Sequence, residues 1–284
     1  MLEVTGLGNV LRALTYVYWL LAIGALALAL VKGNGWRRKV IWSCVVVVVF
    51  GFLPVKALVE KYQRDAFAKK AWAYFEKLCD ERSGYKIYKT FTGVKSVVVT
   101  KPLPPATEKD LYDQFWKGDP YSTEIVSSDR AIMHALTIVG RQKFVGARGD
   151  IGLDFFEIAD ANGNDRYLKV EPLHQYPYKR VTSIAKPSSR FALIWDDIST
   201  EEDRRHWVAA SRLRILDLAD DSVVAERVGF LIESGFGSTS GHRRPWQTSR
   251  TRNTTCPSLL NGTFEDRWFI LKALDPIEGD KNGK

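Results

Sequence analysis

A run of glycines and hydroxyl residues from Gly235 to Gly241 is the first place where this sequence could do chemistry. Its spacing, G-x-G-x-x-x-G, is not the G-x-G-x-x-G of a dinucleotide site, and no Gly-Lys-Ser/Thr follows it as in a phosphate-binding loop. The glycines also approach the nucleophile elbow of acyl hydrolases, but Thr239 stands where that motif requires serine. The loop therefore predicts neither a nucleotide site nor an acyl-hydrolase site.

Metal-binding patterns are equally incomplete. Asp160, Asn162 and Asn164 have the alternate spacing of a calcium loop, but the glycine of its sixth position and its distal glutamate are missing. A hairpin turn at Asn162-Gly163 explains these residues better. The histidines stand singly, with no cysteine at ligand spacing, so we predict no metal site and no cofactor; they are His134, His174, His206 and His242.

The neighbouring carboxylates of Asp196 and Asp197 could be imagined as an acid/base pair. Adjacent residues of a strand point to opposite faces, however, which separates the two carboxylates. Solvation and capping of the following turn are the expected roles. With no catalytic motif elsewhere, the sequence predicts that the protein is not an enzyme.

Two apolar runs dominate the N-terminal part of the chain. A helix needs about 20 apolar residues to cross about 30 Å of hydrocarbon, and the runs at about 13–31 and 40–59 meet that length. We therefore predict a transmembrane hairpin over residues 1–59 and a soluble domain over residues 60–284. The alternative for each run is a buried core helix.

The connection between the runs is strongly basic, with Lys32, Arg37, Arg38 and Lys39. Positive-inside bias places such a loop in the cytoplasm. The soluble domain would then be exported and anchored by two spans; in a bacterial inner membrane, that side is the periplasm. Basic residues at the end of the second span and after it favour the opposite orientation; they are Lys56, Lys61, Arg64, Lys69 and Lys70.

The formal net charge of +8 suggests a polyanionic partner at first sight. Residues 1–59 hold six Lys or Arg and one acidic residue, which leaves a net charge of only +3 for the rest. The basic excess thus belongs mostly to the membrane anchor, and nucleic-acid binding is not predicted. The expected partners are the lipid bilayer and another protein.

The soluble domain reads as α+β, a mostly antiparallel β-structure with flanking helices. Its first helix has an apolar stripe and spans 62–82. A strand pair is expected at 86–90 and 96–100, and hairpins at 153–159 with 166–171 and at 208–218 with 223–233. A further strand covers 191–198, where Ser199 or Thr200 caps the next turn, and Thr263 opens a final helix.

The three cysteines predict one disulfide. Cys44 lies inside the second span, so the exported domain holds only Cys79 and Cys256. An oxidising compartment favours pairing them. The alternative is a pair of buried, unpaired thiols.

Five residues are candidates for contact with a partner protein: Trp116, Tyr121, Arg243, Arg244 and Trp246. Their types are over-represented at binding hot spots, and all lie in predicted turns or irregular stretches. For Trp116 and Trp246, buried packing is favoured over contact with a partner.

Several motifs between about Trp72 and Leu274 together resemble a family of bacterial membrane-anchored proteins with no assigned activity. These motifs are 86–90, 113–116, 118–121, 195–204 with Trp207, 225–227, 235–238, 245–246 and 256–257. The resemblance implies a gene near type VI secretion effector genes. Genes in that position often encode immunity proteins, which bind secreted toxins.

We therefore predict a membrane-tethered, non-enzymatic domain that binds another protein, such as an incoming toxin. Tethering would raise its local concentration at the surface that a toxin must reach. One alternative is a membrane-bound periplasmic hydrolase with a site in the loop 235–257. Another is a structural accessory of an envelope complex, in which Ala25 and Ala29 pack the anchor.

Overall fold

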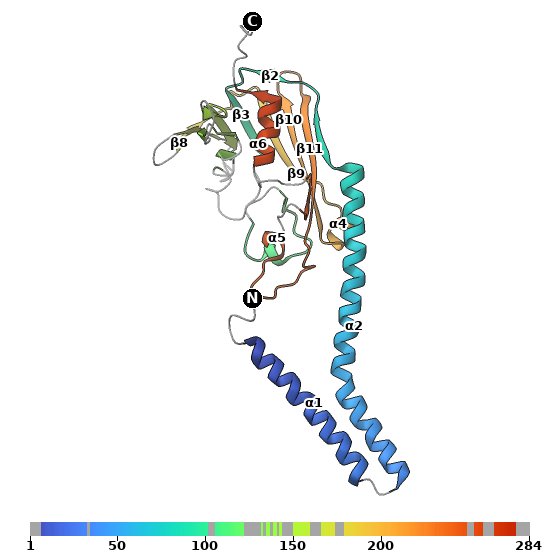
Figure 1. The fold of residues 1–284 in the computed structure, drawn as a ribbon. Coiled ribbons are helices and arrows are strands. Elements are labelled where there is room, and N and C mark those ends of the chain that lie inside the picture. The colour runs from blue at the N-terminus through green and yellow to red at the C-terminus, as the bar shows by residue number, and fades with distance from the viewer. Residues whose placement is uncertain are drawn as a thin grey trace. The chain divides into compact units, whose positions relative to one another are not determined.

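The chain forms two compact units, Met1–Phe67 and Ala68–Lys284, in a computed structural model (Figure 1). The described residues are 7–32, 35–101, 106–121, 132, 135–136, 139–140, 142–143, 150–159, 166–173, 179–248, 253–257 and 264–276. The proposed turn at Asn162-Gly163 with its calcium-like neighbours, His134, His174 and the helix cap Thr263 lie outside the described residues.

Two helices, α1 (Leu7–Lys32) and α2 (Trp36–Arg82), contain the apolar runs. Both are long and apolar enough to cross a membrane. The predicted helices at 40–59 and 62–82 are one continuous helix, because no residue between them stops the α2 backbone. Within the first unit the hydroxyl of Tyr18 donates to the carbonyl of Phe50, and the two rings lie 5.6 Å apart.

The second unit is built on a sheet with the strand order β1-β11-β10-β9-β3-β6-β7-β8, and β12 pairs with β11. Smaller sheets pair β13 with β2 and β4 with β5. The strands are β1 (Gly84–Ile87), β2 (Phe91–Thr92), β3 (Ser96–Lys101), β4 (Gln142–Lys143), β5 (Asp150–Ile151), β6 (Phe155–Ala159), β7 (Tyr167–Pro172), β8 (Lys179–Ile184), β9 (Phe191–Asp197), β10 (Val208–Asp217), β11 (Ser222–Ile232), β12 (Thr255–Cys256) and β13 (Leu274–Asp275).

The unit is α+β, as predicted, but its main sheet is mixed. Strand β3 runs parallel to both of its neighbours, β6 and β9, whereas the other pairs of this sheet are antiparallel. The three valines Val97, Val98 and Val99 are buried, and a strand buried on both faces is typical of parallel pairing.

Both predicted hairpins are confirmed. β10 and β11 pair from Val208 opposite Ile232 to Asp217 opposite Ser222, and β6 pairs antiparallel with β7. The expected pairing of the strands at 86–90 and 96–100 is wrong. β3 has β6 and β9 on its two edges, so β1 pairs instead with residues 225–228 of β11, whose other edge pairs with β10.

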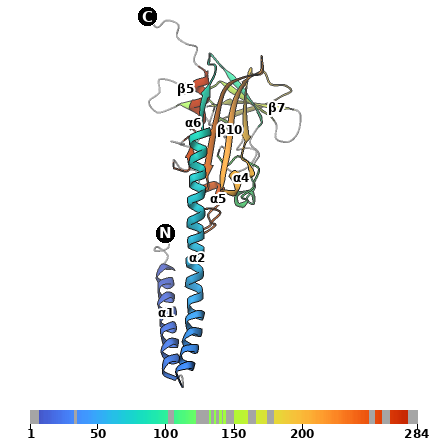
Figure 2. The same ribbon diagram turned by 90° about the vertical axis from the view of Figure 1, so that its right-hand side faces the viewer.

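Short helices flank the sheet: η2 (Asp110–Tyr112), α4 (Glu201–Arg205), α5 (Pro245–Thr248) and α6 (Phe264–Ala273). Figures 1 and 2 show α6 against one face of the sheet. Phe269 and Ile270 of α6 belong with Leu213 and Phe156 of the sheet to the larger of two hydrophobic clusters.

Alternation along β10 explains how this face is divided. Ala209, Ser211 and Leu213 point to the same side of the strand. Leu213 belongs to the larger cluster, and Ala209 belongs to a second cluster. The buried Ser211 lies between them, so polar groups separate two apolar regions on one face.

The predicted disulfide joins Cys79 to Cys256, with their Cα atoms 5.7 Å apart. It ties the last turn of α2 to β12. The same end of α2 buries Ala71, Phe75 and Leu78, so the apolar stripe predicted for this helix packs within the second unit.

Candidate protein-binding surface

Three of the five predicted contact residues are buried together. Trp116, Tyr121 and Trp246 form the second hydrophobic cluster with Leu111, Ala209 and Leu231. Trp207 packs against them, with its ring 5.4 Å from that of Trp246. The structure therefore gives these three side chains a packing role, and they offer little surface to a partner.

Two glycines make room for aromatic rings of this cluster. An added Cβ at Gly118 would lie 2.1 Å from the indole of Trp116. Gly229 of β11 likewise accepts the ring of Tyr121, since a Cβ there would lie 2.5 Å from it. Gly118 thus leaves room for the indole of Trp116, and Gly229 lets the turn at 118–121 approach β11.

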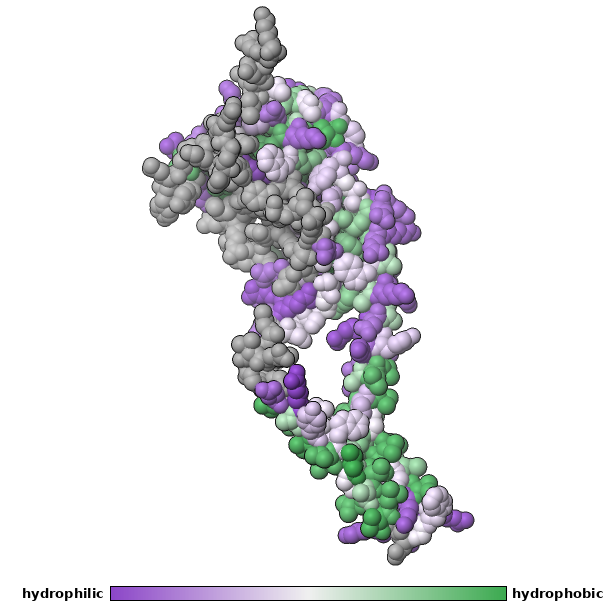
Figure 3. All heavy atoms as spheres, in the orientation of Figure 1, coloured by the Kyte–Doolittle hydropathy of each residue, from purple (hydrophilic) through white to green (hydrophobic). Residues whose placement is uncertain are grey.

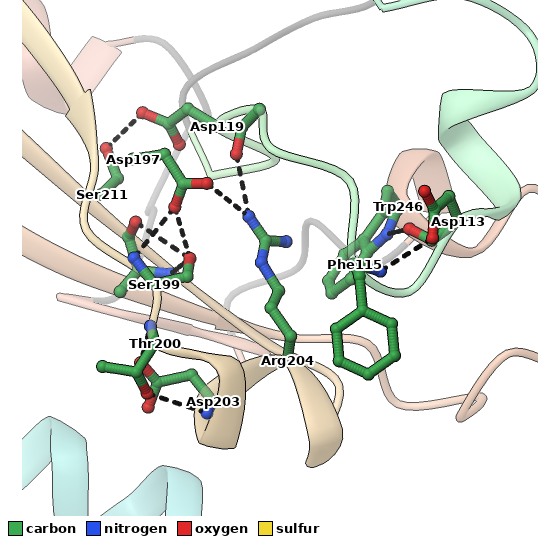
Figure 4. A network of polar contacts seen from close by, with 12 residues as sticks. Asp113, Phe115, Asp119, Asp197, Ser199, Thr200, Asp203, Arg204, Ser211 and Trp246 are labelled. Carbon is green, nitrogen blue, oxygen red and sulfur yellow. Dashed lines mark hydrogen bonds and ion pairs between the residues drawn. The ribbon is translucent and has the colours of Figure 1, made fainter.

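A buried arginine holds the same turn to α4 (Figure 4). The Nη2 atom of Arg204 donates to the Asp197 carboxylate at 2.9 Å and to the carbonyl of Gly118 at 2.8 Å. Its guanidinium carbon lies 5.0 Å from the Trp246 ring centre, and the indole Nε1 donates to the carbonyl of Asp113 at 2.7 Å.

Helix α4 begins with a capping box, which fixes the position of Arg204. The Thr200 side chain accepts from the Asp203 backbone N–H, and the Asp203 carboxylate accepts from the Thr200 N–H. Thr200 is thus the cap. Ser199, the other candidate, donates its hydroxyl to Asp197 at 2.5 Å.

A second buried network crosses the polar part of the sheet face. Ser211 donates to Asp119 at 2.5 Å, and Nη1 of Arg227 donates to the Ser211 hydroxyl at 2.9 Å. Arg227 also pairs with Asp266 of α6. Burial alone would lower the pKa of Arg227, but the Asp266 charge raises it. This arginine is a permanent cation in a structural role.

The glycine loop from Gly235 to Gly241 surrounds a carboxylate. Glu233 accepts the backbone N–H of Gly235 at 2.9 Å and of Gly237 at 2.6 Å. The guanidinium of Arg243 forms an ion pair with the same carboxylate. An added Cβ at Gly235 would lie 1.5 Å from Arg243 Nη1. The glycines thus give Arg243 room to reach Glu233.

Arg244 is the most exposed of the five predicted contacts, with 40% of its side chain accessible. Its Nε lies 2.8 Å from the Glu108 carboxylate, and its Nη1 donates to Gln247 at 3.1 Å. These bonds connect α5 to the segment before η2, so Arg244 has a structural role as well as surface access.

The adjacent carboxylates of Asp196 and Asp197 do point apart. Asp196 binds Lys101 at 2.9 Å and Arg214 at 2.8 Å, whereas Asp197 binds Arg204. Burial would raise the pKa of Asp196, but hydrogen bonds from Lys101 and Arg214 lower it. Across the described ranges, no group of three His, Cys, Asp or Glu side chains could hold a metal ion.

A groove that sequence reasoning missed lies between β1 and α6. It has a volume of about 680 Å³ and is lined by Tyr85, Ile87, Thr90, Pro257, Trp268, Phe269 and Lys272. Trp268 is 54% exposed and Tyr85 is 40% exposed. We call it the β1–α6 groove.

Each wall of this groove follows from local structure. Tyr85 and Ile87 are two residues apart in β1 and share a face; the Tyr85 ring lies 5.4 Å from that of Phe269. Trp268 and Lys272 are four residues apart in α6 and share its outer side. That spacing was the sequence signal for the groove, but nothing in it indicated that β1 would lie opposite.

No family model, curated protein or solved structure matches this chain. Its function is therefore inferred from its own side chains.

Proposed function

We propose that this protein is a membrane-anchored binding protein and that the β1–α6 groove takes an extended segment of a partner protein. The observation that carries the proposal is an exposed aromatic groove beside a terminal strand of the sheet. In this proposal the groove residues bind the partner segment and catalyse no reaction.

Strand addition is the mode of binding that the groove favours. Among the strands that the structure describes, β1 ends the order of the main sheet and pairs through one edge with β11. An extended segment laid along the other edge would gain main-chain hydrogen bonds, and its alternate side chains would enter a neighbouring pocket. Tyr85 and Ile87 project to the side where that pocket lies.

The lining gives the chemistry of the bound segment. Tyr85 and Trp268 offer aromatic surface to an apolar or aromatic side chain. Lys272 lies one helical turn beyond Trp268 and would pair with an acidic side chain. The proposed ligand is therefore an extended stretch with an apolar residue followed by an acidic one.

The membrane anchor would determine the compartment in which the partner binds. The hairpin would span a bacterial inner membrane with its basic connection in the cytoplasm, which places the soluble unit in the periplasm. The family resemblance supports one class of partner, a toxin delivered into the envelope, for which this protein would provide immunity. A toxin gene directly upstream is the expected genetic context.

Site-specific photo-crosslinking in the native host tests the groove. A benzophenone amino acid at Trp268 should give one discrete adduct with the partner. The matched control position is Val181 in β8, which is 42% exposed and lies on the opposite terminal strand of the sheet. Equal adducts from both positions, or none from position 268, would contradict the proposal.

A peptide from the crosslinked region then tests strand addition with the purified chain. We expect it to slow hydrogen exchange of the β1 amides, and Trp268→Ala to weaken its binding by about tenfold or more, as at hot spots. Val181→Ala is the control. If Arg243→Ala with Arg244→Ala weakens binding and Trp268→Ala does not, the partner binds the loop at 243–247 instead.

A further inference from the structure

The first unit contains a second groove, between α1 and α2 near their connection. It has a volume of about 440 Å³ and is lined by Ala25, Leu28, Ala29, Lys32, Arg38, Trp42 and Val46. We call it the hairpin groove. Figure 3 shows hydrophobic residues over the sides of the two helices and hydrophilic residues where they join.

Helical spacing explains why these residues meet. Ala25, Ala29 and Lys32 are four and three residues apart in α1, so they lie along one side of that helix. Arg38, Trp42 and Val46 are four residues apart in α2 and form a matching row. Each row runs from an apolar end to a cationic end, and the two cations come from different helices.

The apolar end of the groove has the shape for a hydrocarbon chain. Ala25, Ala29 and Val46 are partly buried against the opposite helix, and alanine side chains leave space that larger ones would fill. Leu28 and Trp42 are each 58% exposed and form the rims. Trp42 lies near the connection of the two helices, and tryptophan is typical of the membrane–water interface.

The cationic end has the charge for a phosphate. Within the described part of the chain, neither Lys32 nor Arg38 forms an ion pair, and the segment 32–39 contains no acidic residue. Arginine matches phosphate oxygens with a planar fork of donors, and lysine adds a point charge. An anionic headgroup would satisfy both cations.

We propose that the hairpin groove binds one anionic phospholipid, with its phosphate between Lys32 and Arg38 and an acyl chain along Ala25, Ala29 and Val46. The inference rests on the hairpin spanning a bilayer and is independent of the β1–α6 groove. Basic pockets between membrane helices are a recurrent site for such headgroups. The bound lipid would fill the groove and hold the two helices together at the connection.

Native mass spectrometry of the full chain, released from nanodiscs of mixed phosphatidylglycerol and phosphatidylcholine, tests the proposal. The wild type should retain one phosphatidylglycerol in preference to phosphatidylcholine. Lys32→Gln with Arg38→Gln should reduce that preference on the order of tenfold. The control is Arg37→Gln with Lys39→Gln, which removes the same charge from the connection but from residues that do not line the groove.

A second variant separates shape from charge. Ala29→Leu fills the apolar end and leaves both cations in place, so it should also lose the retained lipid. Inorganic phosphate added at millimolar concentration should not displace the lipid, because it lacks the acyl chain. Equal loss in both double variants, no preference in the wild type, or displacement by phosphate alone would overturn the proposal; failure of the wild type to enter the bilayer would overturn its membrane premise.

Discussion

Arg227 and Asp266 form a two-bonded ion pair inside the second unit. Nε of Arg227 donates to Oδ1 at 3.0 Å and Nη2 donates to Oδ2 at 2.8 Å. The arginine side chain is fully buried, and that of Asp266 is 9% exposed. The pair joins β11 to α6 and lies between the two hydrophobic clusters of the sheet face.

Removal of one partner of this pair should be severe. Asp266→Ala leaves the Arg227 charge buried without its carboxylate, and we expect a loss of about 3–5 kcal/mol in the free energy of unfolding. Denaturant unfolding measures it. Glu201→Ala is the control, because Glu201 pairs with Arg205 on the exposed side of α4; its effect should stay below about 1 kcal/mol. Similar values for both variants would contradict a structural role for the buried pair.

The disulfide gives a prediction in two parts. Peptide mass analysis of unreduced protein should find Cys79 and Cys256 linked and only Cys44 free. Cys79→Ser with Cys256→Ser should lower the free energy of unfolding by about 2–5 kcal/mol. Reductant should have the same effect on the wild type and none on the double variant, with Cys44→Ser as the neutral control. Free thiols at positions 79 and 256 in protein from native membranes would refute the bridge and weaken the proposed periplasmic location.

The stability of the second unit at alkaline pH should depend on Tyr74. Burial and the hydrogen bond to Asp203 raise the pKa of Tyr74 to about 12; the hydroxyl donates to Asp203 Oδ1 at 2.7 Å. A phenol whose pKa is raised by folding contributes stability that is complete below its ordinary pKa of about 10. That contribution is lost as the pH rises through about 12.

Tyr74→Phe removes the titrating group. The variant should lose about 1 kcal/mol at neutral pH with the hydrogen bond, and its unfolding free energy should fall less steeply than that of the wild type above about pH 10. Denaturant unfolding across this range makes the comparison. Parallel pH profiles for the two proteins would show that Tyr74 keeps an ordinary pKa.

A side chain at Gly118 should destabilise the protein while Trp116 is present. Gly118→Ala forces the indole away from its position, and overpacking of this kind costs typically about 1–3 kcal/mol. Trp116→Leu frees the space that the new Cβ needs. In a double-mutant cycle measured by denaturant unfolding, the alanine should therefore cost less in the Trp116→Leu background. Strict additivity would mean that the indole does not determine the cost.

The orientation of the anchor is tested with a reporter that is active only in the periplasm. Fused after Lys284, it should be active, and inserted in the connection at 33–35 it should be inactive, because the basic connection is expected in the cytoplasm. A cytoplasmic reporter at the same positions is the control and should give the inverse result. The opposite pattern would reverse the proposed location of the soluble unit.

Local patterns predicted the local parts of this fold. The β10–β11 hairpin was readable because both strands carry apolar residues around a short polar turn, and the disulfide because one cysteine lies in an apolar run. The parallel pairing of β3 was not readable, since the strands on either side of it follow much later in the sequence. The same limit hid the β1–α6 groove.

The roles of the aromatic residues in irregular segments were predicted only in part. The sequence favoured buried packing for Trp116 and Trp246, but the segments that cover them come from distant parts of the chain, as in the contacts of Arg204 with the carbonyl of Gly118 and of Trp246 with that of Asp113. No spacing rule reports such contacts. The sequence identified segments that contribute to the second cluster. Which of their side chains face inward is set by the surrounding segments of the fold.

The bond between Cys79 and Cys256 also determines how the second unit would respond to a mechanical load. A pull along α2 would otherwise reach the sheet through β1, a terminal strand of four residues, and peel its hydrogen bonds from β11 one after another. The covalent link lets tension leave the chain at Cys79 and enter β12, so residues 80–87 carry only part of it. The strand beside the β1–α6 groove is thereby protected, so the binding site proposed there would stay folded under such a load.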